Sequence, residues 1–430
     1  MNEEIKNKLQ QADAAFRHWK NTDFDDRQKL IRKAASILKD RAEEFGKIIT
    51  KEMNKPISQS ISEVEKCALM MEYYADAENV LKPEKIESEF TISEIHYVPK
   101  GVVLGVMPWN FPFWQVLRFA TPTILAGNTM VLKHASICFE SGNAIEKVFI
   151  EAGFPEGIFQ NLEVDHKAVK AILEHDAVKA VSLTGSEKAG AEVASIAGSK
   201  IKKSLLELGG SDAFIILDDA DLDDAAKTGA LARLQNCGQT CVAAKRFIIQ
   251  NSIRDKFLPK FIKEYKKFVP SDPMNKETKI AGMARADLAD DLLKQYEKAL
   301  ENGAEVIIPL EKISDNEFIP GLISVKEGNP ILQEELFGPL GMVLFGENDE
   351  EILKLANDIP FGLSNAVWTK DKKRQQFFTE GLESGTVNVN RMTSSDPRFP
   401  FGGTKSSGYG TELSLLALRE FVTAKTIIGN

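Results

Sequence analysis

The fold of this chain is constrained most strongly by a repeated alternation of short apolar segments with helix-like segments, which begins at Gly101. Residues 101–107 form a nearly continuous apolar run, and residues 129–133 and 178–184 are similar short runs separated by helix-like patterns. Strands of this kind are buried on both faces, as in a parallel sheet covered by helices. We therefore predict an α/β fold with a Rossmann-type, doubly wound sheet that binds a nucleotide at the carboxyl ends of its strands.

Further regular patterns flank this region. Three amphipathic helical patterns come first, one before Asn21 and the others over residues 25–50 and 58–79. Residues 88–99 largely alternate apolar and polar side chains, which indicates a half-buried strand or ribbon. Strands and helices alternate again later in the chain, so we predict a second α/β domain that begins just after Glu207. Its expected strands lie at 213–217, 246–250, 366–369 and 386–389, and its expected helices at 222–234, 253–268 and 288–302.

The composition argues against several classes of function. The chain has 430 residues, a formal net charge of −9 and no block of Lys and Arg, unlike a protein that binds duplex nucleic acid. Its apolar runs are far shorter than a membrane span, and its N-terminus lacks the apolar core of a signal peptide. Four cysteines do not make a disulfide framework, so we expect a protein of the reducing cytoplasm.

One cysteine stands in a context that suggests chemistry. Cys241 follows a Gly-Gln-Thr loop within residues 236–246, and Glu207 lies upstream in the turn Leu-Glu-Leu-Gly-Gly. A cysteine on a loop and a distant carboxylate can form a nucleophile–base pair when the fold brings them together. Taken alone, Cys241 is also compatible with a packed structural thiol, and Glu207 with a solvated carboxylate.

Several ordered motifs make this pair specific. They are PWNFP at 108–112, LTGS at 183–186, ELGG at 207–210, NCGQTC at 236–241, EELFGPL at 334–340 and PFGGTKSSG at 400–408. With these motifs the chain resembles the aldehyde dehydrogenase superfamily over nearly its whole length. Among the branches of that family, the runs KHAS at 133–136 and LGGSD at 208–212 look most like those of the shorter bacterial succinate-semialdehyde dehydrogenases.

The resemblance implies a mechanism for oxidising an aldehyde to a carboxylic acid. Cys241 would attack the carbonyl carbon as a thiolate and form a thiohemiacetal. The side-chain amide of Asn110 and the backbone N–H of Cys241 would stabilise the developing oxyanion. Glu207 would then activate water to hydrolyse the thioester. The alternative for Asn110 is a residue that only forms the turn before Phe-Pro.

The resemblance also implies a nicotinamide cofactor, NADP or NAD, and no metal ion. The GxGxxG fingerprint is absent, but Gly185-Ser186 follows a strand and opens a helix whose N-terminus can face a pyrophosphate. Ser136 stands where members that use NAD commonly carry a glutamate, so we expect NADP to be used at least as well as NAD. Alternatively, Glu140 supplies the missing acid. The residues implied to contact the cofactor are Met107, Pro108, Trp109, Lys133, Ser136, Gly185, Ser186, Leu208, Glu335 and Phe337.

The resemblance implies only some of the residues that would bind the substrate. Arg118 matches an arginine that binds the distal carboxylate of succinate semialdehyde in recognised members, although an interhelical salt bridge is its alternative role. Gln235 stands where some members carry a second arginine, and nearby Arg233 is a candidate substitute. Cys237 shares the loop of Cys241 and is a candidate redox partner. Its alternative is a small residue that fills space, since spacing alone does not establish disulfide geometry.

We therefore expect NAD(P)-dependent oxidation of a small aldehyde, most specifically succinate semialdehyde to succinate. The rivals are a broad-specificity aldehyde dehydrogenase, a CoA-acylating relative, against which Glu207 argues, and a non-catalytic binding protein that retains the fold. The resemblance further implies a homo-oligomer, a dimer or a tetramer, although two edge strands of a monomer are the alternative. The expected domains are a cofactor domain at 1–87 and 101–207, a catalytic domain at 208–405, and oligomerisation elements at 88–100 and 406–430.

Overall fold

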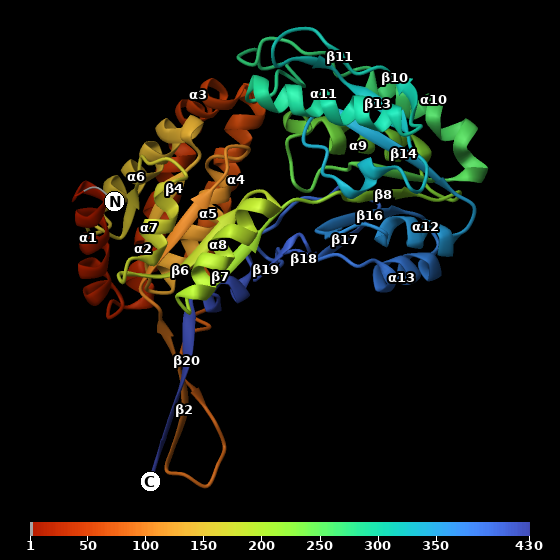
Figure 1. Ribbon diagram of the computed structural model, residues 1–430. Helices are drawn as coiled ribbons and strands as arrows, with labels where there is room; N and C mark the ends of the chain where they lie inside the picture. The colour runs from red at the N-terminus through yellow and green to blue at the C-terminus, as the bar shows by residue number, and fades with distance from the viewer. Residues whose placement is uncertain (1–2) are drawn as a thin grey trace.

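The computed structural model describes residues 3–430, which form two α/β lobes and a projecting stalk of strands (Figure 1). The first lobe contains a six-stranded sheet in the order β19-β7-β6-β3-β4-β5. Its members are β3 (Val102–Met107), β4 (Thr129–His134), β5 (Phe159–Asn161), β6 (Val178–Thr184), β7 (Lys203–Glu207) and β19 (Gly408–Tyr409). Strands β3 to β7 are parallel and β19 runs antiparallel to β7. The predicted α/β fold with a parallel sheet is confirmed.

Helices cover both faces of this sheet. They are α1 (Glu3–Trp19), α2 (Phe24–Asp40), α3 (Ala42–Met53), α4 (Ile57–Ala75), α5 (Trp114–Leu125), α6 (Phe139–Ala152), α7 (Ala168–Glu174) and α8 (Glu187–Ser199), with a short 3-10 turn η1 (Ser136–Cys138). The single helix expected over 25–50 is two helices, because Arg41 leaves the helical region with φ −115° and ψ 23°. Neither Gly nor Pro marks this break, and the apolar pattern continues across it, so the sequence did not show it.

The second lobe contains a seven-stranded sheet in the order β10-β13-β14-β9-β8-β16-β17. Its strands are β8 (Ala213–Ile216), β9 (Arg246–Gln250), β10 (Glu305–Ile308), β13 (Gly321–Ser324), β14 (Leu340–Gly346), β16 (Ser364–Trp368) and β17 (Thr386–Val389). Its helices are α9 (Leu222–Leu234), α10 (Arg254–Tyr265), α11 (Ala286–Glu301), α12 (Asp349–Asn357) and α13 (Lys372–Gly381). Sequence patterns predicted β8, β9, β16 and β17 but missed β10, β13 and β14.

Short elements complete the lobes. Two-residue strands pair as β11 (Glu311–Lys312) with β12 (Phe318–Ile319), and as β15 (Phe361–Gly362) with β18 (Thr404–Lys405). The remaining 3-10 turns are η2 (Gln235–Gly238), η3 (Asn251–Ile253), η4 (Pro330–Gln333) and η5 (Leu415–Arg419). Of these, η2 matters most for function because it leads into Cys241.

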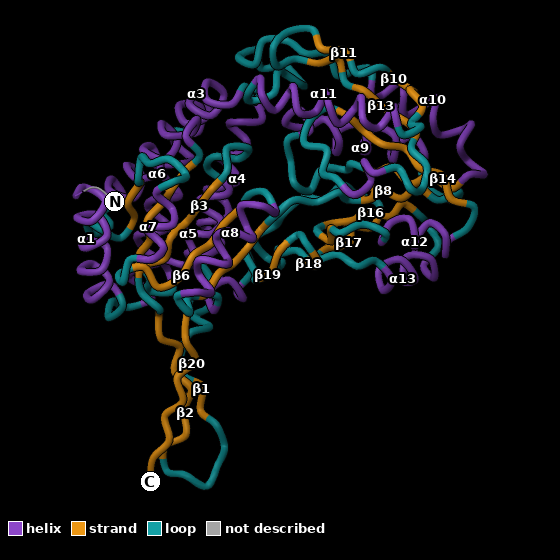
Figure 2. The backbone as a smooth tube through the Cα atoms, viewed as in Figure 1, coloured by secondary structure: helices purple, strands orange, loops and turns teal. Residues whose placement is uncertain are grey.

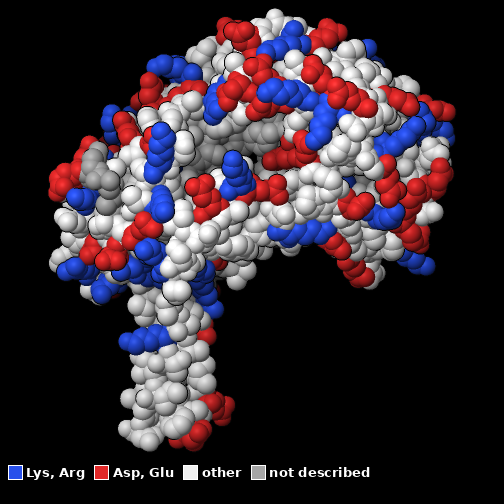
Figure 3. Space-filling model, in the orientation of Figure 1, with Lys and Arg blue, Asp and Glu red and all other residues white. Residues whose placement is uncertain are grey.

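The stalk is a three-stranded antiparallel sheet of β1 (Glu84–Lys85), β2 (Ile92–Pro99) and β20 (Val422–Gly429) (Figure 2). The register of β2 and β20 runs from Ile92 opposite Gly429 to Pro99 opposite Val422. On the visible face, the stalk carries few charged side chains between its base and its tip (Figure 3). Only the end of the expected 406–430 element lies in the stalk, since β19 pairs with β7 and Leu413 and Leu418 are buried in the first lobe.

Strand alternation divides the apolar core of the first lobe between the two faces of its sheet. Val103 and Met107 pack in one cluster with helices α2 to α6, whereas Val102 and Leu104 pack in another with α1, α7 and α8. The second lobe has its own core around β8, β9 and β14. Among the described residues, no helix combines the length and the apolar character that a membrane span needs.

Candidate functional site

Cys241 lies in a loop between α9 and β9 that has an unusual backbone. Asn236, Cys237 and Gly238 have successive φ values of 53°, 55° and 71°. This left-handed conformation is easy for Gly, tolerated by Asn and costly for Cys, so the surrounding structure must hold it in place. The carbonyl oxygen of Gln239 accepts hydrogen bonds from the side-chain amides of Asn110 at 3.1 Å and Asn236 at 3.2 Å. The loop before the cysteine is therefore fixed from both lobes.

Lys245 fixes the other side of the same loop. Its fully buried ammonium donates to the carbonyl oxygen of Thr240 at 2.9 Å, to that of Cys241, and to Glu335 Oε1 at 2.9 Å. Glu335 Oε1 also accepts from the backbone N–H of Gly210 at 3.1 Å. One cation thus ties the cysteine loop to a predicted cofactor residue. No motif singled out Lys245, and only its place four residues after Cys241 hinted at this contact.

Asn110 occupies the turn that joins β3 to α5. Its side chain is buried, and its backbone carbonyl oxygen accepts a hydrogen bond from Asn236 Nδ2 at 2.9 Å. An asparagine amide has two N–H groups, and the described hydrogen bond to Gln239 uses one of them. The other N–H group has no described partner, and its predicted role toward an oxyanion at Cys241 stays a prediction.

A buried ion pair beneath this turn sets the position of α5. Glu63 Oε1 on α4 accepts from the backbone N–H groups of Phe113 at 2.9 Å and Trp114 at 3.0 Å. Its other oxygen pairs with the buried ammonium of Lys55. A carboxylate satisfies the free N–H groups at a helix N-terminus and complements the helix dipole. Local sequence does not predict this contact, because Glu63 lies far from the PWNFP motif along the chain.

Glu207 ends β7 and is buried. Neither of its carboxylate oxygens has a hydrogen-bond partner within residues 3–430. Burial, reinforced by the negative charge of Glu412, holds the pKa of Glu207 well above its usual range. Ser407, in the run PFGGTKSSG, holds the adjoining backbone in place, since Leu208 N–H donates to the Ser407 carbonyl at 2.9 Å and Ser407 Oγ donates to the Gly209 carbonyl at 2.7 Å. A buried carboxyl with a raised pKa suits a general base.

Two cavities meet at Cys241. One, which we call the narrow cleft, has a volume of about 260 Å³. The other, which we call the wide pocket, has a volume of about 430 Å³. The narrow cleft is lined by Pro108, Trp109, Asn110, Gln115, Thr184, Gly185, Ser186, Leu208, Gly209, Cys241, Leu288, Glu335 and Phe337. Cys241 and Gln115 line both cavities, so a group in either one can reach the thiol.

The narrow cleft fits a nicotinamide cofactor. It contains seven of the ten residues implied to contact one, which are Pro108, Trp109, Gly185, Ser186, Leu208, Glu335 and Phe337. The rings of Trp109 and Phe337 meet edge to face, with centroids 5.7 Å apart. Ser186 caps α8 by accepting from the Ala189 N–H at 3.3 Å, and the N-terminus of a helix favours phosphate groups.

The three other implied cofactor residues do not line the cleft. Met107 ends β3 and is buried, and Lys133 lies beside it near the end of β4. Ser136 is exposed at the start of η1. Glu140, the alternative acid, is also exposed, and its Oε1 accepts from Lys51 Nζ at 2.9 Å. Lys133 lies near the carboxyl edge of the sheet and Ser136 just beyond it, where a doubly wound fold binds its nucleotide.

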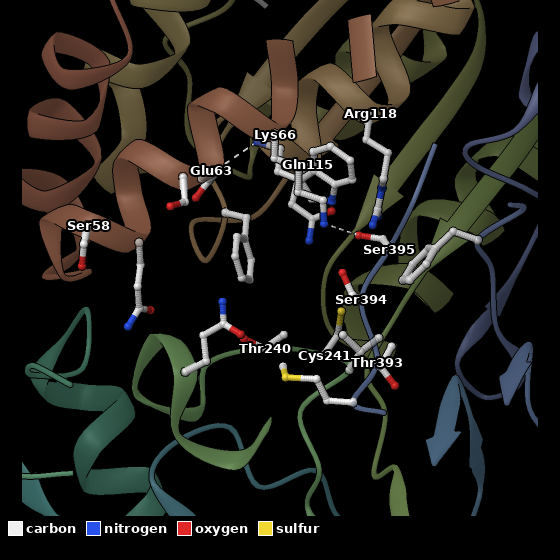
Figure 4. A pocket seen from close by; sticks show the side chains of 18 residues that line it. Ser58, Glu63, Lys66, Gln115, Arg118, Thr240, Cys241, Thr393, Ser394 and Ser395 are labelled. Atoms are coloured by element: carbon white, nitrogen blue, oxygen red, sulfur yellow. Dashed lines mark hydrogen bonds between the residues drawn. The ribbon is translucent and has the colours of Figure 1, made fainter. Parts of the chain in front are cut away.

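The wide pocket contains some of the expected substrate residues (Figure 4). Arg118 reaches it from α5 with its guanidinium 4.5 Å from the Phe401 ring, and Gln235 lines it as well. Nε of Arg118 pairs with the buried carboxylate of Glu412. Arg233 does not line this pocket, because its guanidinium is buried and donates to the carbonyl oxygens of Leu336, at 3.0 Å, and of Gly338. The expectation that Arg233 binds substrate is therefore corrected to a structural role.

Several polar residues of the wide pocket were not predicted from the sequence, among them Lys66, Ser394 and Ser395. Lys66 on α4 donates from Nζ to Ser395 Oγ at 2.7 Å, and Ser394 lines the pocket beside Ser395. Figure 4 shows Arg118 pointing toward Ser394 and Ser395, with Cys241 below them. These residues come from four distant parts of the chain, and no local motif links them.

The two cysteines of the loop have different surroundings. Cys237 is buried in the core of the second lobe, whereas Cys241 is half-buried and packs against the core of the first. Burial raises the pKa of Cys237 to about 12 and that of Cys241 to about 11. The positive charges of Lys245 and Arg118 favour the thiolate and so partly offset the rise in the pKa of Cys241. A redox partnership between the two thiols stays a hypothesis.

Comparison with protein families matches residues 1–427 to the aldehyde dehydrogenase family. The chain belongs to the aldehyde dehydrogenase family. It is 45% identical over 428 residues to a probable succinate-semialdehyde dehydrogenase [NADP(+)] of Synechocystis, covering 99% of this chain and 94% of the relative. It is 41% identical to a succinate semialdehyde dehydrogenase [NAD(P)+] of Escherichia coli, covering 99% and 93%.

Solved structures of the aldehyde dehydrogenase family agree. The succinic semialdehyde dehydrogenase of Streptococcus pyogenes, solved with NADP+ as the cofactor, superposes with a TM-score of 0.97 at 37% identity. The match covers 100% of this chain and 96% of that structure. The resemblance on which the sequence analysis relied is confirmed.

Proposed function

We propose that this aldehyde dehydrogenase oxidises succinate semialdehyde to succinate and uses NADP in preference to NAD. The observation that carries the proposal is the position of Cys241, which lines both the narrow cleft that fits a nicotinamide and the wide pocket. The wide pocket also presents the cations Lys66 and Arg118 to a substrate carboxylate. The names of the Synechocystis, E. coli and S. pyogenes relatives support the same substrate.

The residues of the site divide the chemistry between them. The Cys241 sulfur attacks the aldehyde carbon, and the free N–H of the Asn110 amide and the backbone N–H of Cys241 stabilise the resulting oxyanion. A nicotinamide in the narrow cleft supplies the acceptor for the hydride. Glu207 takes a proton from the water that cleaves the thioester. Lys245 holds Cys241 in place throughout, since its ammonium binds the carbonyl oxygens of Thr240 and Cys241.

Two residues support the preference for NADP. Ser136 places a hydroxyl, not a carboxylate, near the expected 2′ position, so this residue does not repel a 2′-phosphate. The alternative acid, Glu140, is bound by Lys51. Lys133 lies near the end of the adjacent strand β4 and supplies a cation on the same edge of the sheet.

The stalk supports assembly into a homo-oligomer. Strand β20 stands at the edge of the β1-β2-β20 sheet and exposes Ile428, and Ile92 and Val98 are exposed on the neighbouring strand β2. An exposed edge strand with apolar side chains is suited to pairing with another chain. All four cysteines are free thiols, which fits the reducing cytoplasm proposed as the location.

A substrate panel with both cofactors tests the function. We expect NADPH formation with a higher kcat/KM for succinate semialdehyde than for butanal, its neutral four-carbon counterpart, and slower turnover with NAD. The aromatic lining of Phe111, Trp114 and Phe401 would also accept an apolar aldehyde. A kcat/KM for butanal equal to or above that for succinate semialdehyde would therefore favour a broad-specificity enzyme and contradict the proposal.

A further inference from the structure

The two cations of the wide pocket differ in how their charges are balanced. Arg118 pairs through Nε with Glu412, and the side chains of both residues are 2% exposed. The backbone fixes this pair, because Glu412 and Phe401 exchange two hydrogen bonds of 2.7 and 2.8 Å and the Phe401 ring stacks on the guanidinium. Arg118 thus reaches the pocket with a counter-ion already in place, although its Nη2 has no hydrogen-bond partner within residues 3–430.

Lys66 reaches the same pocket with an unbalanced charge. Its Nζ donates to the neutral hydroxyl of Ser395 and lies 4.1 Å from the centroid of the Trp114 ring. Within the described part of the chain it forms no ion pair, since the acids nearest to it are engaged elsewhere. Glu63 is held by Lys55 and by the N-terminus of α5, and Asp396 pairs with Arg398 at 2.6 Å.

We propose that Lys66 is the residue that selects aldehydes carrying a distal carboxylate, and that Ser395 and the free Nη2 of Arg118 complete its subsite. This role rests on the proposed function and deepens it, because it assigns the selection of carboxylate-bearing aldehydes to a lysine on α4 that lies outside the sequence motifs. A carboxylate placed there gains a charge-assisted hydrogen bond from Lys66, which is stronger than a neutral one. It also restores charge balance to a partly desolvated ammonium.

The groups around Lys66 make this selection dependent on pH. Burial and the positive charge of Arg118 on α5 lower the pKa of Lys66 to about 8, and Cys67 and Glu63 on α4 and Asp396 oppose them weakly. The ammonium is present at pH 7 and is lost as the pH rises past 8. The KM for succinate semialdehyde should accordingly rise above that pH.

The test compares wild type with Lys66→Met, Lys66→Arg and a matched control, Lys47→Met, which removes an exposed lysine of α3. For each, the kcat/KM for succinate semialdehyde is divided by that for butanal. We expect this ratio to fall roughly 10- to 100-fold in Lys66→Met, mainly through KM, and to stay at the wild-type value in Lys47→Met. In Lys66→Arg, which keeps its charge at high pH, the KM should stay level above pH 8.

The possible failures are distinguishable. A wild-type ratio near one would overturn the proposed function, whatever the variants do. A wild-type preference that survives in Lys66→Met would overturn the role of Lys66 and leave the function standing. Calorimetric titration with succinate measures carboxylate binding without turnover, and its affinity should fall in Lys66→Met. If that variant does not fold, Ser395→Ala and the pH profile of Lys66→Arg test the same subsite, and wild-type behaviour of both would contradict it.

Discussion

The side-chain amide of Asn110 donates a hydrogen bond to the carbonyl oxygen of Gln239 at 3.1 Å. This contact joins the turn after β3, in the first lobe, to the loop that carries Cys241, in the second. A second hydrogen bond runs in the opposite direction, since Asn236 Nδ2 of the same loop donates to the backbone carbonyl oxygen of Asn110 at 2.9 Å. The proposed oxyanion donor and the proposed nucleophile are therefore positioned relative to each other before a substrate binds.

The first prediction concerns Asn110 as the donor of a hydrogen bond to the oxyanion. Asn110→Ala should lower kcat by roughly 100- to 1,000-fold, because an oxyanion donor acts in the transition state, while the KM for the cofactor stays close to wild type. Steady-state kinetics measure the loss, and cofactor titration with the thermal midpoint serves as the control for folding. A kcat within about threefold of wild type would show that the backbone N–H of Cys241 suffices alone.

The second prediction concerns the pH dependence of the thiol. Burial raises the pKa of Cys241 to about 11, so at neutral pH the thiolate is a small fraction that grows as the pH rises. In the cofactor-free enzyme, the rate of Cys241 alkylation by iodoacetamide should therefore rise about tenfold per pH unit between pH 7 and pH 9. A rate that levels off below pH 8 would mean that Lys245 and Arg118 outweigh burial.

The third prediction concerns the cofactor. Ser136→Glu should reduce the ratio of kcat/KM for NADP to that for NAD at least about tenfold, because a carboxylate there repels the 2′-phosphate. Glu140→Gln is the matched control, since Glu140 is exposed and bound by Lys51. A clear rise of this ratio in Glu140→Gln would instead identify Glu140 as the acid that binds the ribose hydroxyls of NAD.

The fourth prediction concerns the ion pair beneath α5. Lys55→Met should destabilise the protein by about 3–5 kcal/mol, because it leaves the Glu63 carboxylate buried without its cation. Lys47→Met removes an exposed ion pair with Glu43 and should cost at most about 1 kcal/mol. Urea unfolding measures the loss of stability in both variants. The double variant Lys55→Met with Glu63→Gln should recover part of the loss, and no recovery would contradict the pairing.

Local sequence predicted the parts of the fold that depend on periodicity. The strands at Val178–Thr184, Arg246–Gln250 and Thr386–Val389 and the helix at Leu222–Leu234 have the expected bounds. The break at Arg41 was missed, because it changes the chain direction without changing the apolar pattern. The strand Leu340–Gly346 was missed as well, since it begins at the last residue of the EELFGPL motif and no turn signal separates the two.

The site was predicted where function resides in contiguous motifs. Cys241, Asn110 and Glu335 meet at or near the narrow cleft as expected. Lys66 and Lys245 were not predicted, because a lone lysine has no local signature and its role depends on what the fold places around it. Arg233 was assigned by its nearness in sequence to Gln235, but the end of α9 turns its side chain toward the Leu336 carbonyl.

The central claim is that Cys241 carries the acyl group and Glu207 releases it. The most direct measurement is a rapid-mixing experiment on Glu207→Gln with succinate semialdehyde and NADP, followed by intact-mass and peptide analysis. We predict a burst of NADPH stoichiometric with active sites, slow turnover afterwards, and a succinyl adduct on the peptide that contains Cys241. Fast steady turnover without a burst, or an adduct on another residue, would contradict the account.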